Sequence, residues 1–263
     1  MLAVGTVVVK YGGNAMGEAD GPEPLLEEIG ALCRAGSRVV LVHGGGPEID
    51  RALAERSIAT RRVDGLRVTD AATLEVTEAV LCATLNKRLV RACLALGIPA
   101  VGVSGQDGAM LVARPCANGA ELGYVGEIET ADTLLLRTLL GAGYLPVVAP
   151  LAIAAGAAHA YNVNADLSAA ALAAALRADA FVAVTNVARV YRDLGDPTSG
   201  IDRLSVAEAV EFAAGDACRS SMKPKLLAAA SAVAGGAKAA YICSAAAGAI
   251  GAALAGAATM VAA

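Results

Sequence analysis

Two patterns of hydrophobic and polar residues alternate along the N-terminal part of the chain. Residues 6–9 and 38–42 are short, mainly apolar runs, which are typical of parallel strands buried on both faces. Each run leads into a glycine-rich loop and then into apolar residues at helical spacing, around 25–32 and from Pro47 onward. Because this order of strand, loop and helix occurs twice in succession, the sequence predicts right-handed βαβ units and a parallel sheet.

The same alternation continues through the middle of the chain. Further strands are predicted at 98–103, 144–148 and 180–184, and further helices at 71–95, around 134–140 and over 166–176. Residues 109–129 alternate without a helical stripe and contain glycine turns, so we expect β-hairpins laid over a site there. The predicted fold class is therefore α/β with a mostly parallel sheet.

A boundary between two lobes is expected near residue 177. Residues 1–177 would form the N-terminal lobe and residues 178–263 the C-terminal lobe. Alanine becomes frequent toward the C-terminus, because 41 of the 63 alanines lie beyond residue 150. The elements predicted in the second lobe are helices near 205–214 and 223–235, and strands over 239–243 and 258–262 with a short helix between them.

Composition narrows the class of protein. Hydrophobic residues make up 56% of the 263 residues and the mean hydropathy is +0.58, which excludes an intrinsically disordered chain. The formal net charge is −4 and the charges are dispersed, so no nucleic-acid partner is predicted. Residues 242–263 carry no charge, but they contain few large apolar side chains, and we expect no membrane span there.

Cysteine and histidine usage argues against metal and disulfide chemistry. The chain has six cysteines, none of them in a CxxC pair, and only two histidines. No metal site built from protein side chains and no disulfide framework is predicted from this set. Reduced thiols in a cytoplasmic protein are the simplest interpretation, and no signal peptide is expected because Lys10 interrupts the first apolar run.

Glycine loops are the first candidates for chemistry. No Gly-Lys-Ser/Thr sequence occurs, which excludes a Walker A loop, and no GxGxxG follows a strand, which argues against a dinucleotide site. The loops at 12–13 and 44–46 lie instead at the carboxyl ends of predicted strands, where open α/β sheets bind ligands. Because glycine lets backbone N–H groups approach a phosphate closely, and the helix after Pro47 adds its positive end, the two loops favour an anion site.

Several side chains near these loops have two interpretations. Lys10 ends an otherwise apolar strand, and its place before a glycine loop favours contact with an anion over extension into solvent. Lys225 is equally compatible with a solvated charge at a helix start, and Arg67 with a solvated loop charge. Asp166 can act as a helix N-cap, and Asn162 can shape a loop.

Six sequence blocks that contain these residues follow one another along the chain. They are KYGGNAM at 10–16, HGGGP at 43–47, GLRVTD at 65–70, GVSGQDG at 102–108, NVNAD at 162–166 and MKPK at 222–225. In this combination the chain resembles the acetylglutamate kinase family of the amino acid kinase fold, and the resemblance runs from about residue 6 to 235.

This resemblance implies a three-layer αβα sandwich with two lobes. The N-terminal lobe would bind N-acetyl-L-glutamate and the C-terminal lobe would bind ATP with Mg²⁺. The family reaction transfers the γ-phosphoryl group to the side-chain carboxylate, the second step of arginine biosynthesis. A carboxylate with an ordinary pKa near 4 is already ionised at neutral pH, so no general base is needed. The protein then has to hold two anions in line and to neutralise the charge on the transferred group.

The resemblance also implies roles for individual residues. Lys10 and Lys225 would flank the transferred phosphoryl group, and Asp166 would orient both ammonium groups. Arg67 and Asn162 would hold acetylglutamate. Backbone N–H groups would contact phosphate or substrate carboxylate at Gly12, Gly13, Gly44 and Gly45. The nucleotide would be bound by Thr185, Asn186, Val187, Tyr191 and Met222.

Three departures from the family pattern fall in the proposed ATP lobe. Ser220 and Ser221 replace a Gly-Gly pair before Met222, and Asn186 and Arg189 replace an acid and a glycine after the nucleotide strand. The third is the Ala/Gly tract from Ser244 onward, in which only Thr259 matches the family's Gly-Thr. Two alternatives to a free-acetylglutamate kinase therefore stay open. One is a kinase for aminoadipate or glutamate linked to a carrier protein in lysine biosynthesis, and the other is a catalytically weak, ligand-binding homologue.

An expectation about assembly follows from the same resemblance. Members that arginine inhibits carry an extra N-terminal helix that links dimers into a hexamer, whereas here the first predicted strand begins at Thr6. Five residues are too few for such a helix. We expect a homodimer built across a two-fold axis, without arginine feedback.

Overall fold

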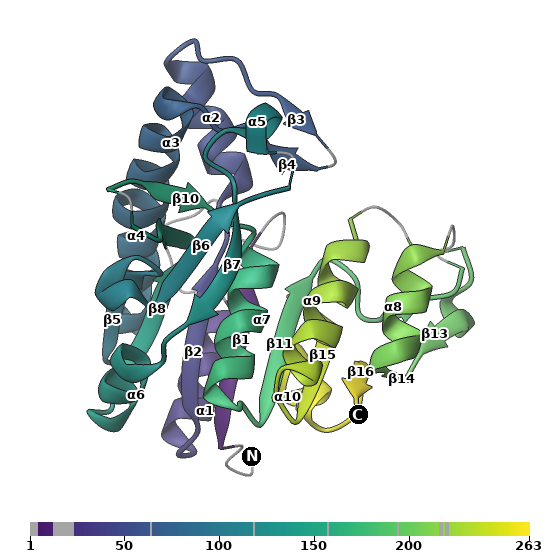
Figure 1. Ribbon diagram of the computed structural model, residues 1–263. Helices are drawn as coiled ribbons and strands as arrows, with labels where there is room; N and C mark the ends of the chain where they lie inside the picture. Colours follow the sequence, from purple (N-terminus) through teal and green to yellow (C-terminus); the bar gives the residue numbers. More distant parts are fainter. Residues whose placement is uncertain are drawn as a thin grey trace.

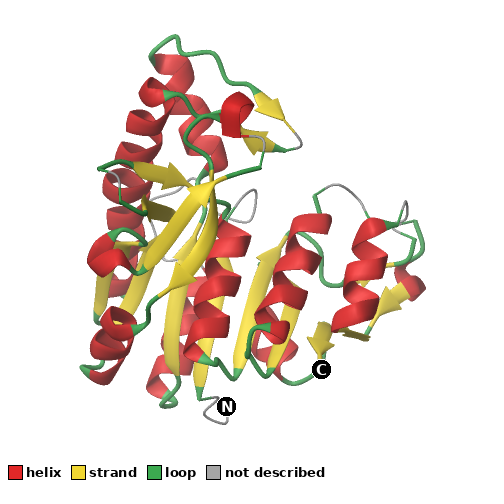
Figure 2. Ribbon diagram, in the orientation of Figure 1, coloured by secondary structure: helices red, strands yellow, loops and turns green. Residues whose placement is uncertain are grey.

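A central sheet of eight strands runs through the molecule (Figures 1 and 2). The computed structural model describes residues 5–12, 24–63, 65–117, 119–156, 158–193, 195–215, 218 and 221–263. In spatial order the strands of this sheet are β14 (Arg203–Ser205), β16 (Thr259–Ala262), β15 (Ala239–Ser244), β11 (Ala180–Thr185), β1 (Thr6–Tyr11), β2 (Arg38–His43), β8 (Leu145–Ala149) and β5 (Ala100–Ser104). All neighbours are parallel except β15 and β16, which confirms the predicted, mostly parallel sheet.

Helices cover both faces of this sheet and make the three-layer αβα sandwich (Figure 1). One face carries α6 (Leu134–Gly141), α7 (Ala165–Leu176), α8 (Val206–Ala214) and α9 (Lys223–Ala234). The other carries α1 (Pro24–Arg34), α2 (Gly46–Glu55), α3 (Ala71–Glu78), α4 (Asn86–Ala95) and α10 (Ala249–Leu254). Successive side chains of β1 alternate between the two layers, since Val8 faces the first and Val7 and Val9 the second. Every strand residue of β1 is therefore buried.

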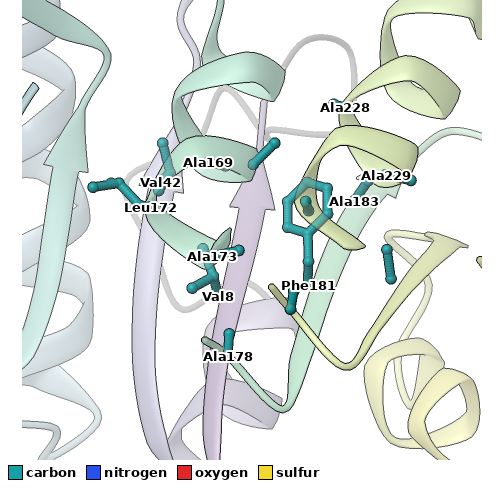
Figure 3. Packing of buried hydrophobic residues seen from close by; sticks show 14 of the residues in the cluster. Val8, Val42, Ala169, Leu172, Ala173, Ala178, Phe181, Ala183, Ala228 and Ala229 are labelled. Atoms are coloured by element: carbon teal, nitrogen blue, oxygen red, sulfur yellow. The ribbon is translucent and has the colours of Figure 1, made fainter. Parts of the chain in front are cut away.

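Alanine has a packing function in the first layer. Phe181 is fully buried, and several alanines of α7 and α9, including Ala173 and Ala229, lie in the same cluster (Figure 3). Side chains this small let α7 and α9 pack closely side by side over β1 and β11. Many alanines of the C-terminal part of the chain, above all those of α9, are thus part of the core.

A second, smaller sheet lies beyond β8 and approaches the carboxyl ends of the central strands. Its order is β10 (Ala160–Asn162), β9 (Leu151–Ala154), β6 (Leu111–Pro115) and β7 (Gly126–Ala131). The antiparallel pair β6 and β7, with the short α5 (Gly119–Leu122) between them, confirms the hairpin predicted for 109–129. The sequence pattern did not predict β9 and β10, which pair with each other over only three residues.

The helix predicted over 71–95 has an internal change of winding. Between α3 and α4 the chain forms a π-helical segment, η2 (Ala79–Leu85), so the three elements run on without a break. Two minor hairpins complete the structure, β3 (Arg62–Val63) with β4 (Leu66–Arg67) and β12 (Val190–Tyr191) with β13 (Gly200–Ile201). One-turn 3₁₀ helices occur at Asp107–Ala109 and Pro197–Ser199. A π segment of this kind frequently marks a functional site.

The uncharged C-terminal stretch has the arrangement predicted for it. β15, α10 and β16 follow one another between Ala239 and Ala262, and both strands belong to the central sheet. In the part of the chain that the structure describes, no helix has the length and apolarity needed to cross a bilayer. The six cysteines, all of them described, form no disulfide.

Candidate active site

A cavity of about 280 Å³ opens at the carboxyl ends of β1 and β2, where the glycine loops were predicted to form a site. Its walls come from β1, the loop before α2, the β3–β4 hairpin and the start of α7, with one lysine from α9. Five charged or polar residues that the sequence predicts to act on the substrate line this cavity: Lys10, Lys225, Asp166, Arg67 and Asn162. Arg62, which was not predicted, lines it as well.

Lys10 and Lys225 converge on the carboxylate of Asp166. Lys10 Nζ lies 2.9 Å from Asp166 Oδ1, and Lys225 Nζ lies 3.6 Å from Oδ2. Among the described residues Oδ1 accepts no aligned hydrogen bond, so its contact with Lys10 is an ion pair. Asp166 does not cap α7, because Asn164 takes that position and accepts from the Asp166 N–H at 2.8 Å.

Burial strengthens the electrostatic interactions among these charged groups. The Lys10 side chain is only 6% exposed and that of Asp166 8%. Burial lowers the pKa of Lys225, the neighbouring Asp166 carboxylate raises it, and Lys10 lowers it again. Two ammonium groups therefore share a single carboxylate. This arrangement leaves a net positive charge that a phosphoryl group can neutralise.

Arg67 is a buried ligand-binding candidate and is not a solvated loop charge. Its Nη1 donates to Asp50 Oδ1 at 2.5 Å and its Nη2 to the Gly46 carbonyl at 3.1 Å. Asp50 also accepts from Arg62 Nη2 at 2.7 Å through its second oxygen. Burial alone would raise the pKa of Asp50, but hydrogen bonds from the two guanidinium groups bring this pKa below its ordinary value.

The cross-strand register of the β3–β4 hairpin places Arg62 directly opposite Arg67. Like charges in that position repel, and the bridging Asp50 offsets this repulsion. Two guanidinium groups consequently line one wall of the cavity. Such groups bind carboxylates in a fixed geometry.

The glycine loops pack against each other beneath the cavity. A Cβ on Gly12 would lie 2.8 Å from the Gly44 nitrogen, and a Cβ on Gly45 would lie 2.3 Å from Leu85 Cδ1 in η2. The backbone contact therefore requires glycine at position 12, whereas at position 45 an added methyl would have to displace the Leu85 side chain. Gly13, which was also predicted to bind phosphate, lies outside the described residues.

One expectation about the glycine N–H groups is wrong. The Gly44 N–H donates to the Tyr11 carbonyl at 2.8 Å, so it is not available to an anion in this structure. The N–H groups of Gly12 and Gly45 have no acceptor among the described residues. Of the two HGGG glycines named from sequence, Gly45 is thus the one that still offers a donor at the cavity.

Asn162 is the last residue of β10 and lines the cavity. Its Nδ2 donates to Thr69 Oγ1 at 3.2 Å, and its backbone N–H donates to the Tyr124 carbonyl at 2.9 Å. Thr69 is fully buried and donates in turn to the Arg67 carbonyl at 2.8 Å. The amide of Asn162 is therefore linked through one buried hydroxyl to the backbone of Arg67.

The residues predicted for the nucleotide lie outside this cavity, toward the C-terminal strands. Thr185 is buried at the end of β11 and its hydroxyl lies 3.2 Å from the Asn186 side-chain oxygen. Val187 precedes the β12–β13 hairpin that contains Tyr191, and Met222 is the N-cap of α9. None of these five residues lines the cavity, whereas Lys10, Lys225 and Asp166 all do.

The sequence departures in this region have structural consequences. Arg189 forms an ion pair with Asp202, and buried Thr259 donates to the Ile201 carbonyl while accepting from the Val190 N–H. Thr259 therefore anchors the β12–β13 hairpin to the end of the sheet. Ser221 contributes only its carbonyl, 3.4 Å from Lys225 Nζ. Ser220 lies outside the described residues.

Comparison with known proteins identifies the family of the chain. The model of the amino acid kinase family matches residues 5–244. "Acetylglutamate kinase" of Rubrobacter xylanophilus is 44% identical over 251 residues, which cover 95% of this chain and 94% of that protein. "Acetylglutamate kinase, chloroplastic" of Arabidopsis thaliana is 45% identical over 201 residues, and the match spans 76% of this chain and 58% of the plant protein.

Solved structures show the same fold. N-acetylglutamate synthase from Neisseria gonorrhoeae, complexed with coenzyme A and N-acetyl-glutamate, superposes with a TM-score of 0.81 at 26% identity, over all of this chain and 60% of that one. Carbamate kinase from Giardia lamblia bound to AMP-PNP superposes with a TM-score of 0.72 at 19% identity, over 99% of each chain, which shows the fold alone. The chain belongs to the amino acid kinase family. Within that family it belongs with the acetylglutamate kinases, which it matches at 38–45% identity.

Proposed function

We propose that the protein phosphorylates the side-chain carboxylate of N-acetyl-L-glutamate with ATP, the second step of arginine biosynthesis. The observation that carries this proposal is the pairing of two lysines on Asp166 at one end of a cavity whose other wall holds Arg67 and Arg62. A substrate with two carboxylates matches these two cationic regions. The guanidinium wall suits the α-carboxylate, which places the side-chain carboxylate toward Lys10.

The chemistry we propose needs charge and alignment and no proton transfer. An oxygen of the ionised side-chain carboxylate attacks the γ-phosphorus, the bond from that phosphorus to the β–γ bridging oxygen breaks, and ADP leaves. Lys10 and Lys225 stabilise charge on the equatorial oxygens of the transferred group, and Asp166 keeps the two ammonium groups in place. Gly45 and Gly12 supply backbone N–H donors. Arg67 and Asn162 orient the acetylglutamate.

We propose that ATP reaches this centre from the C-terminal side, with residues 1–177 as the acetylglutamate lobe and residues 178–263 as the nucleotide lobe. Lys225 supports this assignment, because it enters the cavity from α9 while its helix packs on β11 and β15. Thr185, Asn186, Val187, Tyr191 and Met222 are the proposed nucleotide contacts. The described residues contain no group of three histidine, cysteine or acidic side chains suited to a metal, so we propose that Mg²⁺ arrives bound to the nucleotide phosphates, whose charge it neutralises.

An ATP-dependent hydroxamate assay with purified protein tests the proposal. Hydroxylamine traps an acyl phosphate, so colour should appear with N-acetylglutamate and ATP and should be absent when either is omitted. Turnover only with a carrier-linked aminoadipate or glutamate would favour the lysine-pathway alternative. No turnover with either, together with retained acetylglutamate binding, would favour a ligand-binding homologue.

We also propose that the protein is a cytoplasmic homodimer. The six thiols support a reducing compartment. A two-fold contact through the N-terminal lobe is supported by β5, which is the edge strand of the central sheet, and by two exposed apolar side chains, Leu94 on α4, the helix that packs on β5, and Tyr144 before β8. Light scattering measures the mass directly, and a monomer or a hexamer would contradict this assignment.

A further inference from the structure

His43 is completely buried directly below the glycine loop, and the mechanism described above does not use it. Its Nδ1 lies 2.9 Å from the Gly44 carbonyl oxygen, and its Nε2 lies 3.3 Å from Asn86 Nδ2. A carbonyl oxygen only accepts and an amide nitrogen only donates, so these two partners fix the ring as the neutral tautomer with its proton on Nδ1. Burial lowers the pKa of His43 to about 4, which agrees with a neutral ring.

Asn86 is held equally firmly. It is 1% exposed, and its Nδ2 also lies 2.8 Å from the Val147 carbonyl oxygen and 3.2 Å from the Val103 carbonyl oxygen, so its two hydrogens are shared among three acceptors. With the amide reversed, its oxygen would face both carbonyl oxygens, so the donor orientation is the one that the site permits. Asn86 is the first residue of α4 and follows the π-helical segment whose Leu85 contacts the glycine loop. Asn86 thus connects the end of the π-helical segment to the His43 ring.

This chain of contacts fixes the orientation of one peptide unit. In a trans peptide the carbonyl of Gly44 and the N–H of Gly45 point in opposite directions. His43 holds the Gly44 carbonyl on the buried side, and the preceding Gly44 N–H is held by the Tyr11 carbonyl. The Gly45 N–H therefore points away from His43, and Gly45 lines the cavity.

We propose that His43, supported by Asn86, is a positioning residue that turns the Gly45 N–H into the cavity so that it donates to the transferred phosphoryl group. This proposal rests on the proposed kinase function for the identity of the anion. The orientation of the peptide does not depend on that function. Because the ring carries no charge and does not touch the cavity, its effect on the reaction passes entirely through the Gly44–Gly45 peptide.

Two variants of similar size and polarity separate positioning from general stability. In His43→Asn, the side-chain nitrogen stands at the same number of bonds from Cβ as Nδ1 and still donates to the Gly44 carbonyl. In His43→Gln, the amide reaches the place of Nε2 and loses that bond. We expect kcat to stay within a few-fold of wild type for His43→Asn and to fall on the order of 10²-fold for His43→Gln, the effect of one lost oxyanion donor. The Kd for acetylglutamate should change by less than about threefold in both.

Nuclear magnetic resonance on ¹⁵N-labelled full-length protein tests the geometry without relying on turnover. The His43 ring should show a protonated Nδ1 and an unprotonated Nε2, and the Gly45 amide signal should shift when inorganic phosphate is added to the wild type and to His43→Asn, but not to His43→Gln. If the wild type lacks kinase activity yet these spectra agree, the proposed function fails and the positioning role stands. A ring protonated on Nε2, or equal kcat and equal phosphate-induced shifts in both variants, would overturn the proposal. The wild-type spectra decide even if one variant does not fold.

Discussion

Asp50 Oδ1 lies 2.5 Å from Arg67 Nη1, although Asp50 belongs to α2 and Arg67 to β4. This ion pair joins α2, the helix after the second glycine loop, to the β3–β4 hairpin. That hairpin carries Arg67, which we propose binds a carboxylate of the substrate. The Arg67 side chain is only 6% exposed, so a bound carboxylate meets a guanidinium whose direction is already set. Pre-organisation of this kind lowers the entropic cost of binding.

Removal of Arg67 should therefore weaken substrate binding more than it slows the reaction. For Arg67→Ala we expect KM for acetylglutamate to rise about 10- to 100-fold, the usual effect of a lost charged hydrogen bond, with little change in kcat. Asp50→Ala should act in the same direction and less strongly. Arg61→Ala is the matched control, because Arg61 pairs with Glu121 on the surface and its loss should leave KM unchanged. Unchanged KM in Arg67→Ala would remove Arg67 from the substrate site.

The two cavity lysines should show the opposite behaviour. Lys10→Ala and Lys225→Ala should each reduce kcat on the order of 10²- to 10³-fold and affect acetylglutamate binding much less, because their charge acts mainly in the transition state. Lys238→Ala serves as the control, since Lys238 pairs with Asp179 at the surface. Steady-state kinetics measures both quantities. A near-wild-type kcat for Lys225→Ala would contradict the placement of α9 at the reaction centre.

Asp166→Asn should move the alkaline limit of activity. Burial lowers the pKa of Lys225, and the Asp166 carboxylate is the group that raises it again. When that carboxylate becomes a neutral amide, this pKa falls further and Lys225 loses its proton at a lower pH. The alkaline limb of the kcat profile should therefore lie at lower pH in Asp166→Asn than in wild type. An unchanged limb, with kcat reduced at every pH alike, would show that Lys225 does not set it.

The sequence predicts most of this site because each motif lies next to a strong pattern. Lys10 ends a run of valines, and Asp166 opens an alanine helix, so their positions at strand and helix ends could be read directly. Asp50 and Arg62 could not be found in this way, since their roles depend on the fold of β3 onto β4 above α2. The same holds for His43 and Asn86, which lie 43 residues apart and meet only in three dimensions. The local pattern of 71–95 predicts a helix but does not encode its π-helical winding.

The buried ring of His43 should make stability depend on pH. The pKa of His43 is about 4 in the folded state and 6.5 when the ring is exposed. Between pH 4 and pH 6.5 the ring is therefore protonated in the unfolded chain and neutral in the folded protein. Stability contributed by this group is complete above about pH 6.5 and is lost as the pH falls toward 4, by roughly 3 kcal/mol. Urea unfolding at several pH values should show this loss in wild type and a smaller one in His43→Asn. Parallel curves for the two proteins would refute it.

Two neighbouring glycines should respond differently to a methyl group. At Gly45 a Cβ would lie 2.3 Å from Leu85 Cδ1 and 2.8 Å from Leu81 Cδ2, whereas at Gly46 it would meet nothing within 4 Å. Gly45→Ala should therefore lower the free energy of unfolding by about 1–3 kcal/mol through overpacking, and Gly46→Ala should leave it nearly unchanged. Thermal melts of the pair measure this contrast. Equal melting temperatures would contradict this prediction and would show that the η2 side chains move to make room for the added methyl.

Continuity of the central sheet limits how this enzyme can move. β1 and β11 are paired in register from Val7 with Ala180 to Lys10 with Ala183, so the segments before and after the proposed boundary at residue 177 are joined along a strand ladder. Separating β1 from β11 would break those hydrogen bonds. Lys10 belongs to this ladder, so its position relative to β11 is set when the sheet forms. The strands under the site thus act as one continuous platform, and a change in the distance between Lys10 and Lys225 has to come from α9.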